Sequence, residues 1–260
     1  MAASLILLRH AAGQSGFDLD RGVGDGWVAF ASSQVPLRIW VRDADDGHLV
    51  ALSQANVARS LADAGMGQAR SLALPEGAVA ARWVATRPEL HALLRRAFKL
   101  SGTLPNHLLK RFEEAAAKLP RTTEAERLVV QRVGQDVFRG GLLDYWEGHC
   151  AVTGLAVPTL LRASHMKPWA SCATDEERLD AYNGILLAAH LDAAFDAGLI
   201  TFADDCAMVV SPSLGAEALA TLGWSTSLRL RRLEAAHLPY LAWHRERVFV
   251  RGESSPTERK

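Results

Sequence analysis

The chain has 260 residues, of which 29 are basic and 29 acidic, so its formal net charge is zero. Hydrophobic residues make up 49% of it, a share typical of folded globular proteins and too high for a disordered polyelectrolyte. A chain without net charge lacks the positive field of a general nucleic-acid binder, so any DNA-binding surface has to be local. It has no apolar run of about 18 residues and no basic stretch before its first apolar run, so we expect neither a membrane span nor a signal peptide.

Three cysteines, Cys150, Cys172 and Cys206, lie far apart and form no Cys-x-x-Cys pair. An odd number at wide spacing argues against a disulfide framework and against a four-cysteine zinc site. Cys150, Cys172 and His149 would be zinc ligands in kind, but their spacing lacks the usual pairing. We therefore predict a reduced, cytoplasmic protein.

Residues 1–104 predict a small α/β domain. An Asp45-Asp46-Gly47 turn between two apolar runs favours a β-hairpin, and Pro88 suits the first turn of a helix. The expected strands are 27–30, 37–41 and 82–86, and the expected helices are 54–64 and 88–99. This domain is a candidate for recognising DNA or a modified base.

Four aromatic residues of this domain admit two interpretations. Side chains of this kind line pockets that hold a base flipped out of the duplex, and they also form the core of small sheets. The sequence favours the core. The four residues are Trp27, Phe30, Trp40 and Trp83.

Residues 105–260 predict a helical linker followed by a mixed helix and strand domain. Thr122 or Thr123, followed by Glu124 and Glu126, is typical of the start of a long helix, which we expect to run through Trp146. The other expected elements are a linking helix at 104–121, a strand and turn at 148–154, strands at 158–165 and 183–189, a helix from 190 to 197, a hairpin at 201–210, a helix at 214–223 and a helix or extended segment at 239–250. The polar tail from Ser254 is expected to fray.

The most informative stretch lies between residues 163 and 196. It begins Ala-Ser-His-Met-Lys-Pro-Trp at 163 and continues from 182 with Tyr-Asn-Gly-Ile-Leu-Leu-Ala-Ala-His-Leu-Asp. His165, Asn183 and His190 therefore follow one another with an apolar, strand-like run between the last two. A metal-assisted cut of a phosphodiester needs a group that activates water, a group that orients it and a group that holds a cation.

The sequence around these residues resembles an HNH endonuclease of the kind found in restriction-type proteins, from about residue 132 to residue 211. The matching pieces, in order, are 134–139, 142–145, 150–154, 163–169, 183–187 and 195–200. The resemblance implies a C-terminal ββα-metal (HNH) nuclease domain within 105–260, preceded by the small α/β domain, so the predicted fold class is α+β. Residues 1–104 resemble no family that we can name.

The resemblance implies catalytic roles for His165, Asn183 and His190. His165 would be the general base, which needs a pKa near neutrality and a fixed orientation; the alternative is a core or capping histidine. Asn183 would hold the two strands together and orient the base, and the alternative is an ordinary Asn-Gly turn. His190 would hold the metal. Trp169 is expected to wall the site or fill the core, and Phe195, Asp196 and Gly198 to close the helix after His190.

The predicted metal ligands are His190, Asp192 and Ser164. An imidazole and a carboxylate favour Mg²⁺ or Mn²⁺, with Ni²⁺ and Zn²⁺ as alternatives. Many HNH enzymes carry an acidic residue or a histidine just before the base, where this chain has Ser164. A hydroxyl is a weak ligand, and Asp192 could equally cap the helix.

The predicted DNA contacts are Arg139, Arg162 and Lys167, with Arg132 beside them. Cutting both strands usually takes two nuclease centres, which favours a homodimer. The leading hypothesis is a metal-dependent DNA endonuclease of restriction or phage defence whose α/β domain selects target DNA, which in one version carries modified bases. Two alternatives are an inactive DNA-binding module with an HNH fold and a nuclease toxin, and RNA as substrate stays open.

Overall fold

The computed structural model describes residues 2–104, 107–117, 119–120, 122–225 and 227–251. The chain divides into two compact units, Met1–Leu108 and Leu109–Lys260. The dividing point lies in α4 (His107–Ala116). No helix in the described ranges is long and apolar enough to cross a membrane.

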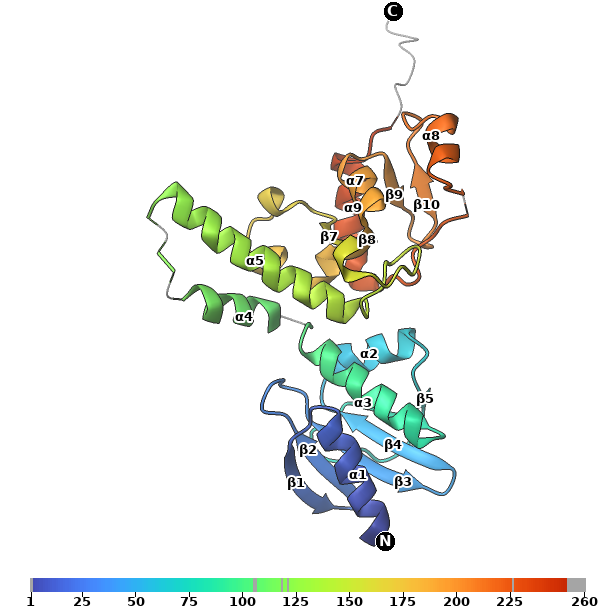
Figure 1. The fold of residues 1–260 in the computed structure, drawn as a ribbon. Coiled ribbons are helices and arrows are strands. Elements are labelled where there is room, and N and C mark those ends of the chain that lie inside the picture. Colours follow the sequence, from blue (N-terminus) through green and yellow to red (C-terminus); the bar gives the residue numbers. More distant parts are fainter. Residues whose placement is uncertain (1, 105–106, 118, 121, 226, 252–260) are drawn as a thin grey trace, which may run out of the picture. The chain divides into compact units, whose positions relative to one another are not determined.

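The first unit is a six-stranded antiparallel sheet with three helices (Figure 1). The strand order is β1-β2-β3-β4-β6-β5. The strands are β1 (Leu19–Gly24), β2 (Trp27–Ala31), β3 (Ile39–Ala44), β4 (Gly47–Leu52), β5 (Gln68–Ala69) and β6 (Ala80–Val84), and the helices are α1 (Ala2–Gln14), α2 (Ala55–Asp63) and α3 (Arg87–Ser101).

The predicted elements of this unit are confirmed, and three were missed. Asp45 and Asp46 form the turn of the β3–β4 hairpin, because Ala44 pairs with Gly47. Thr86 caps α3 with its hydroxyl on the Glu89 N–H, and proline stands in the first turn as expected. The missed elements are α1, β1 and β5. Their sequences carry no cap, no alternation or too few residues to give a pattern.

In the second unit, a pair of antiparallel strands contacts the long helix α5 and also the shorter helix α7 (Figure 1). Thr123 caps α5 (Glu124–Tyr145) through a capping box with Glu126, which confirms the predicted start. The other elements are β7 (Leu161–His165), α6 (Asp175–Arg178), β8 (Gly184–Ala188), α7 (Ala189–Asp196), β9 (Ile200–Phe202), β10 (Met208–Val210), α8 (Ala216–Thr221) and α9 (Leu238–Arg247).

Two predictions for this unit need correction. Residues 148–154 form turns and contain no strand, because Gly148 and Gly154 have φ of +70° and +74°, which breaks the extended backbone. The linking helix is shorter than expected and ends at Ala116. Pro105 and Arg121, which belong to that prediction, and the tail from Ser254 lie outside the described residues.

Candidate active site

The site is built on the two-stranded sheet of β7 and β8. The strands are antiparallel, with Ser164 opposite Ile185 and His165 opposite Gly184. Neighbouring residues of a strand point to opposite faces. Ser164 faces α7, where its hydroxyl meets Asp192, and His165 faces α5, where its ring meets Phe138. The hairpin therefore has two sides with different chemistry.

His165 is held on three sides. Its ring stacks on Phe138 at 3.8 Å between centroids and meets Trp169 edge-on at 5.8 Å. Its Nε2–H donates to the carbonyl oxygen of Arg178 over 2.9 Å. Burial lowers the pKa of His165 from 6.5 to about 4, partly offset by that hydrogen bond. The imidazole is consequently neutral at pH 7, and Nδ1 carries its free lone pair.

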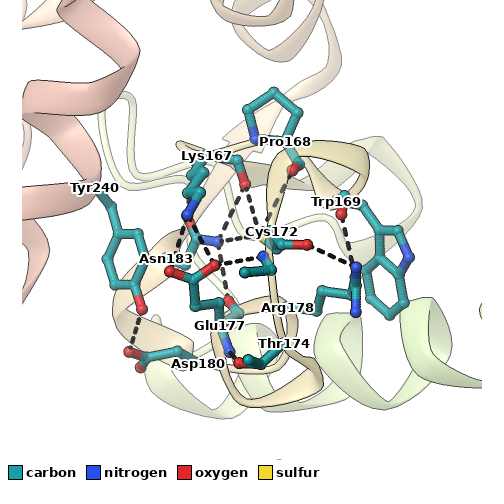
Figure 2. Close-up of polar contacts among 11 residues, drawn as sticks. Lys167, Pro168, Trp169, Cys172, Thr174, Glu177, Arg178, Asp180, Asn183 and Tyr240 are labelled. Carbon is teal, nitrogen blue, oxygen red and sulfur yellow. Dashed lines mark hydrogen bonds and ion pairs between the residues drawn. The ribbon is translucent and has the colours of Figure 1, made fainter.

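Asn183 fastens the loop that leads from β7 to β8 (Figure 2). Its Oδ1 accepts from the Lys167 N–H at 2.8 Å, and its Nδ2 donates to the carbonyl oxygens of Lys167 and Glu177 at 3.1 and 3.0 Å. The side chain is fully buried. The amide thus fixes the Glu177–Arg178 peptide, which is adjacent to the Arg178–Leu179 peptide whose carbonyl accepts the hydrogen bond of His165.

The alternative of an Asn-Gly hairpin turn at this position is wrong. Asn183 ends a 3-10 turn and Gly184 begins β8. A Cβ on Gly184 would come within 2.5 Å of Leu142 and 2.7 Å of Phe138. Glycine is therefore required here by close packing under His165, and a turn conformation plays no part.

Trp169 closes the outer wall of the His165 side. A Cβ on Gly134 of α5 would lie 2.5 Å from the indole, so the tryptophan packs directly on the helix backbone. On its other side, the Arg178 guanidinium lies 5.9 Å from the ring centroid. Trp169 thus has the packing role that the sequence favoured.

The other side of the hairpin carries carboxylates. Ser164 donates its hydroxyl to Asp192, which lies in the first turn of α7. Asp196 follows one turn later on the same face. Its pKa is raised to about 6, chiefly by burial and also by the negative charge of Asp192. The alternative that Asp192 caps α7 is wrong, because the N-cap is Ala188 and no side chain caps this end.

His190 points elsewhere. Residues two apart on a helix lie about 200° apart around the axis, so His190 and Asp192 do not share a face. The exposed ring of His190 lies 5.6 Å from that of Trp224. Within the described ranges, no group of three or more His, Cys, Asp or Glu side chains is placed to hold a metal. The three predicted ligands are thus only partly brought together, as Ser164 with Asp192.

The carboxylate oxygens on this side are nevertheless ligands of the type that a hard divalent cation binds. Mg²⁺ commonly takes one or two carboxylates and completes its shell with water and phosphate oxygens. Asp192 and Asp196 repel each other, and a bound cation would relieve that repulsion. These two carboxylates are the residues that would hold the ion, while Ser164 orients Asp192.

Comparison with known families bears on this arrangement. The family model described as HNH endonuclease matches residues 150–203. Residues 150–203, called the HNH segment below, are therefore similar to an HNH endonuclease. The match confirms the resemblance drawn from the sequence, and it spans the turns at 150–154, β7, β8, α7 and β9. A search of curated proteins gave no match.

The two buried cysteines of the HNH segment have structural contacts. Cys150 Sγ accepts from the N–H groups of Thr153 and Ala188 at 3.4 and 3.3 Å. Cys172 Sγ lies 3.4 Å from Asn183 Nδ2 and 3.4 Å from the Lys167 carbonyl.

The predicted DNA-contacting cations of the HNH segment and α5 are largely engaged inside the unit. Arg139 donates to the carbonyl oxygens of Leu161 and Pro158, both at 2.7 Å. Lys167 Nζ lies between both carboxylate oxygens of Glu177 at 2.9 and 2.8 Å. Arg162 is exposed but turns back to the carbonyls of Thr159 and Leu161.

Three residues that hold the site were not predicted as part of it. Phe138 stacks on His165, Glu177 supplies a carbonyl to Asn183, and Arg178 supplies the carbonyl to His165. Glu177 and Arg178 lie in the short helix α6, whose N-terminus Thr174 caps. In the sequence, only the position of this short helix between His165 and Asn183 could have indicated that it belongs to the site.

Proposed function

We propose that the protein is a metal-dependent DNA endonuclease in which His165 is the general base. The observation that carries the proposal is the orientation of its ring, with Nε2–H bound to the Arg178 carbonyl and Nδ1 free as an acceptor. A neutral, oriented imidazole can accept the proton of a water molecule that attacks phosphorus, although its pKa of about 4 lies below the near-neutral value expected of the base from the sequence.

In the proposed reaction, water adds to the phosphorus opposite the leaving oxygen, and its proton passes to Nδ1 of His165. The P–O bond to the leaving oxygen breaks, and that oxygen takes a proton from solvent. Asn183 is a positioning residue, because it fixes the Glu177–Arg178 peptide. A divalent cation would supply positive charge to the phosphate oxygens, and the carboxylates that would hold one, Asp192 and Asp196, lie across the hairpin from His165.

The substrate and biological role belong to the same proposal. The family match favours DNA as the substrate. We assign the enzyme to restriction or phage defence, with Met1–Leu108 as the target-selecting unit, because this unit is compact and separate from the HNH segment. A homodimer would supply two centres for the two strands of a duplex.

A second candidate is an inactive DNA-binding module with an HNH fold. The observation that favours it is the Ser164–Asp192 hydrogen bond, which engages one carboxylate while His190 faces away from it. Under this alternative, the buried His165 is a packing residue between Phe138 and Trp169.

Cleavage of plasmid DNA separates the two candidates. Methylated and unmethylated plasmids are incubated with the wild-type protein in Mg²⁺, Mn²⁺ or Ni²⁺, and with EDTA. The nuclease proposal expects metal-dependent cutting that falls by about 10²- to 10⁴-fold in His165→Ala. His149→Ala is the matched control, because that ring lies in the same unit and bonds to the carbonyl of Glu147 in its own turn.

Cutting of one plasmid preparation over the other supports selection of modified or unmodified DNA by the first unit. A folded protein that binds DNA but cuts neither plasmid in any metal supports the inactive module. Equal loss in His165→Ala and His149→Ala contradicts a specific role for His165.

A further inference from the structure

The sheet of the first unit has one face that its helices do not cover. Pairing across the strands puts Trp40 beside Ala29 and Ala51, and Arg42 beside Leu49, which pairs in turn with Trp83. The cluster on this face is Trp27, Trp40, Leu49, Ala51 and Ala81, with Ala29, Ala44, Leu72, Ala78 and Trp83 packed against it. None of these described members comes from α1, α2 or α3, so this face borders solvent or the loop before β6.

Three arginines lie on the indole rings of this face. The guanidinium carbon of Arg42 is 4.5 Å from the Trp27 ring centroid, and that of Arg70 is 4.6 Å from Trp83. Arg38 lies 5.6 Å from Trp40. A planar guanidinium supported by an aromatic ring loses less side-chain freedom when it binds an anion.

The indoles themselves are not available to a base. Trp27 is 3% exposed and Trp40 is 9% exposed, and a base could stack on them only by displacing Arg42 or Arg38. The groups that the face presents are therefore the guanidiniums. For Trp27 and Trp40 this favours the core interpretation, with the arginines as their cover.

Two of the three cations lack a counter-charge. Arg70 forms an ion pair with Asp46 at 2.9 Å, and Asp46 also accepts from the Trp83 indole N–H. Arg38 and Arg42 form no ion pair with any residue that the structure describes. Arg38 is exposed and Arg42 is half-buried. A neutral chain thus carries two unpaired, supported cations four residues apart on this face, Arg38 just before β3 and Arg42 within it.

The cations of the second unit that were predicted to contact DNA are already engaged, which makes the unpaired arginines of the first unit the better candidates. Arg139 and Lys167 are bound to internal carbonyl and carboxylate groups, so they are poorly placed to contact a duplex. Phosphate contacts fix a protein on DNA without reading sequence, and they come from guanidiniums and ammonium groups that are free.

We propose that Arg38 and Arg42 contact the phosphate backbone of duplex DNA, with the Trp27 and Trp40 rings as their supports. This inference rests on the proposed function for its choice of DNA as the ligand. It narrows the role of the first unit, since this face would hold DNA in place whatever its base sequence. Guanidiniums bind phosphate through paired N–H groups, which the stacked plane leaves directed outward along its edge.

The test is binding of the full-length protein to a fluorescein-labelled DNA duplex in EDTA, followed by anisotropy over a series of salt concentrations. The double variant Arg38→Gln/Arg42→Gln removes both contacts. We expect affinity to fall by at least about tenfold and the slope of log K against log salt to lose about 1.8, since each phosphate contact contributes about 0.9.

The matched control is Arg59→Gln/Arg95→Gln, which makes the same change in net charge on exposed positions of α2 and α3. It should bind with the wild-type slope. The Arg38→Lys/Arg42→Lys protein should also keep the slope, because it keeps both charges, and it guards against a folding defect in the glutamine variant.

Three outcomes overturn the proposal: no binding by the wild-type protein, wild-type binding by the glutamine variant, and equal loss in the matched control. Failure of the proposed nuclease is read separately from the plasmid experiment. A wild-type protein that binds the duplex with the expected slope but never cuts refutes the proposed nuclease activity. The proposal that this surface contacts DNA is then still supported.

Discussion

The two sides of the β7–β8 hairpin differ in how completely the protein has satisfied its own polar groups. On the His165 side, the imidazole, the Asn183 amide and the Lys167 ammonium group each have partners within the unit. On the α7 side, Asp192 has one hydroxyl partner, and Asp196 has a pKa raised by burial and by its neighbour.

This difference indicates that the His165 side of the site is preorganised before any ligand binds. Buried groups with all bonds made are rigid, so the base side can orient a proton acceptor without help from a ligand. Two close carboxylates are a poor arrangement for a folded protein by itself and a good one for a bound cation. Each prediction below weakens either the His165 side of the hairpin, which we call the closed side, or the packing that supports the α7 side.

Asn183→Ala should give the largest loss. It leaves the Lys167 N–H and the Glu177 carbonyl without their partner, and each unsatisfied buried group costs about 1–3 kcal/mol. We expect the free energy of unfolding of the second unit to fall by about 3–5 kcal/mol, measured as the drop of its thermal transition.

Asn183→Asp is the companion variant. It keeps the acceptor for the Lys167 N–H but sets a buried carboxylate against the carbonyl oxygens of Lys167 and Glu177, so at neutral pH its melting temperature should fall at least as far as that of the alanine variant. An alanine variant that melts with the wild type would mean that the amide does not hold the loop.

Acid should weaken the support behind α7. His244 is buried, stacks on Phe195 at 3.7 Å, donates Nε2–H to the Phe195 carbonyl and accepts from Thr201. Burial lowers its pKa from 6.5 to about 4. The unfolded chain therefore binds the proton first as the pH falls, and stability present above pH 6.5 is lost between pH 6.5 and 4.

The loss attributable to His244 is about 2–3 kcal/mol across that window. Urea unfolding at pH 7.5 and pH 4.5 measures it, and His244→Leu should show a smaller difference between the two pH values. A variant with the same pH dependence as the wild type would assign the acid sensitivity to other groups.

Alanine substitutions of two glycines of α5 test how this helix packs against Trp169, which covers the His165 side. Gly134→Ala puts a Cβ 2.5 Å from the Trp169 indole, whereas the nearest atom to a Cβ on Gly140 is an Arg111 nitrogen at 4.0 Å. Overpacking costs about 1–3 kcal/mol, and alanine in a helix gains about 0.5–1 kcal/mol over glycine. Gly134→Ala should therefore lower the melting temperature and Gly140→Ala should raise it.

The same helix shows how far the sequence alone could go. The start of α5 was predicted because the capping box of Thr123 and Glu126 is a local signal that needs no tertiary contact. The C-terminal closure of α7 was predictable for the same reason, since Gly198 has φ of +69° and its N–H bonds to the Phe195 carbonyl.

The site was predictable only where side-chain identity carries the chemistry. His165 and Asn183 were found from their types and order, but the acceptor of His165 is a backbone carbonyl, which has the same chemistry at every residue and leaves no trace in a sequence. The split between His190 and Asp192 follows from where α7 begins, and helix ends are set by packing as much as by pattern. Arg139 shows the same limit, because only the fold brings its guanidinium to Pro158 and Leu161.

Lys167 gives the smallest expected effect and the most direct test of the closed side. Its side chain is 17% exposed and its ammonium group is bound to Glu177, so Lys167→Gln should cost about 1 kcal/mol of stability. The slope of DNA binding against salt should stay unchanged, since a cation already paired inside the protein releases few counterions from DNA.

Glu177→Gln is the informative counterpart, because it removes the carboxylate and frees the lysine. DNA affinity should then rise and the salt slope should increase by up to about 0.9. If Lys167→Gln instead loses slope while Glu177→Gln leaves it unchanged, Lys167 exchanges Glu177 for a phosphate when DNA binds. In that case the His165 side would open toward its substrate, and the contrast between the two sides of the hairpin would hold only for the free protein.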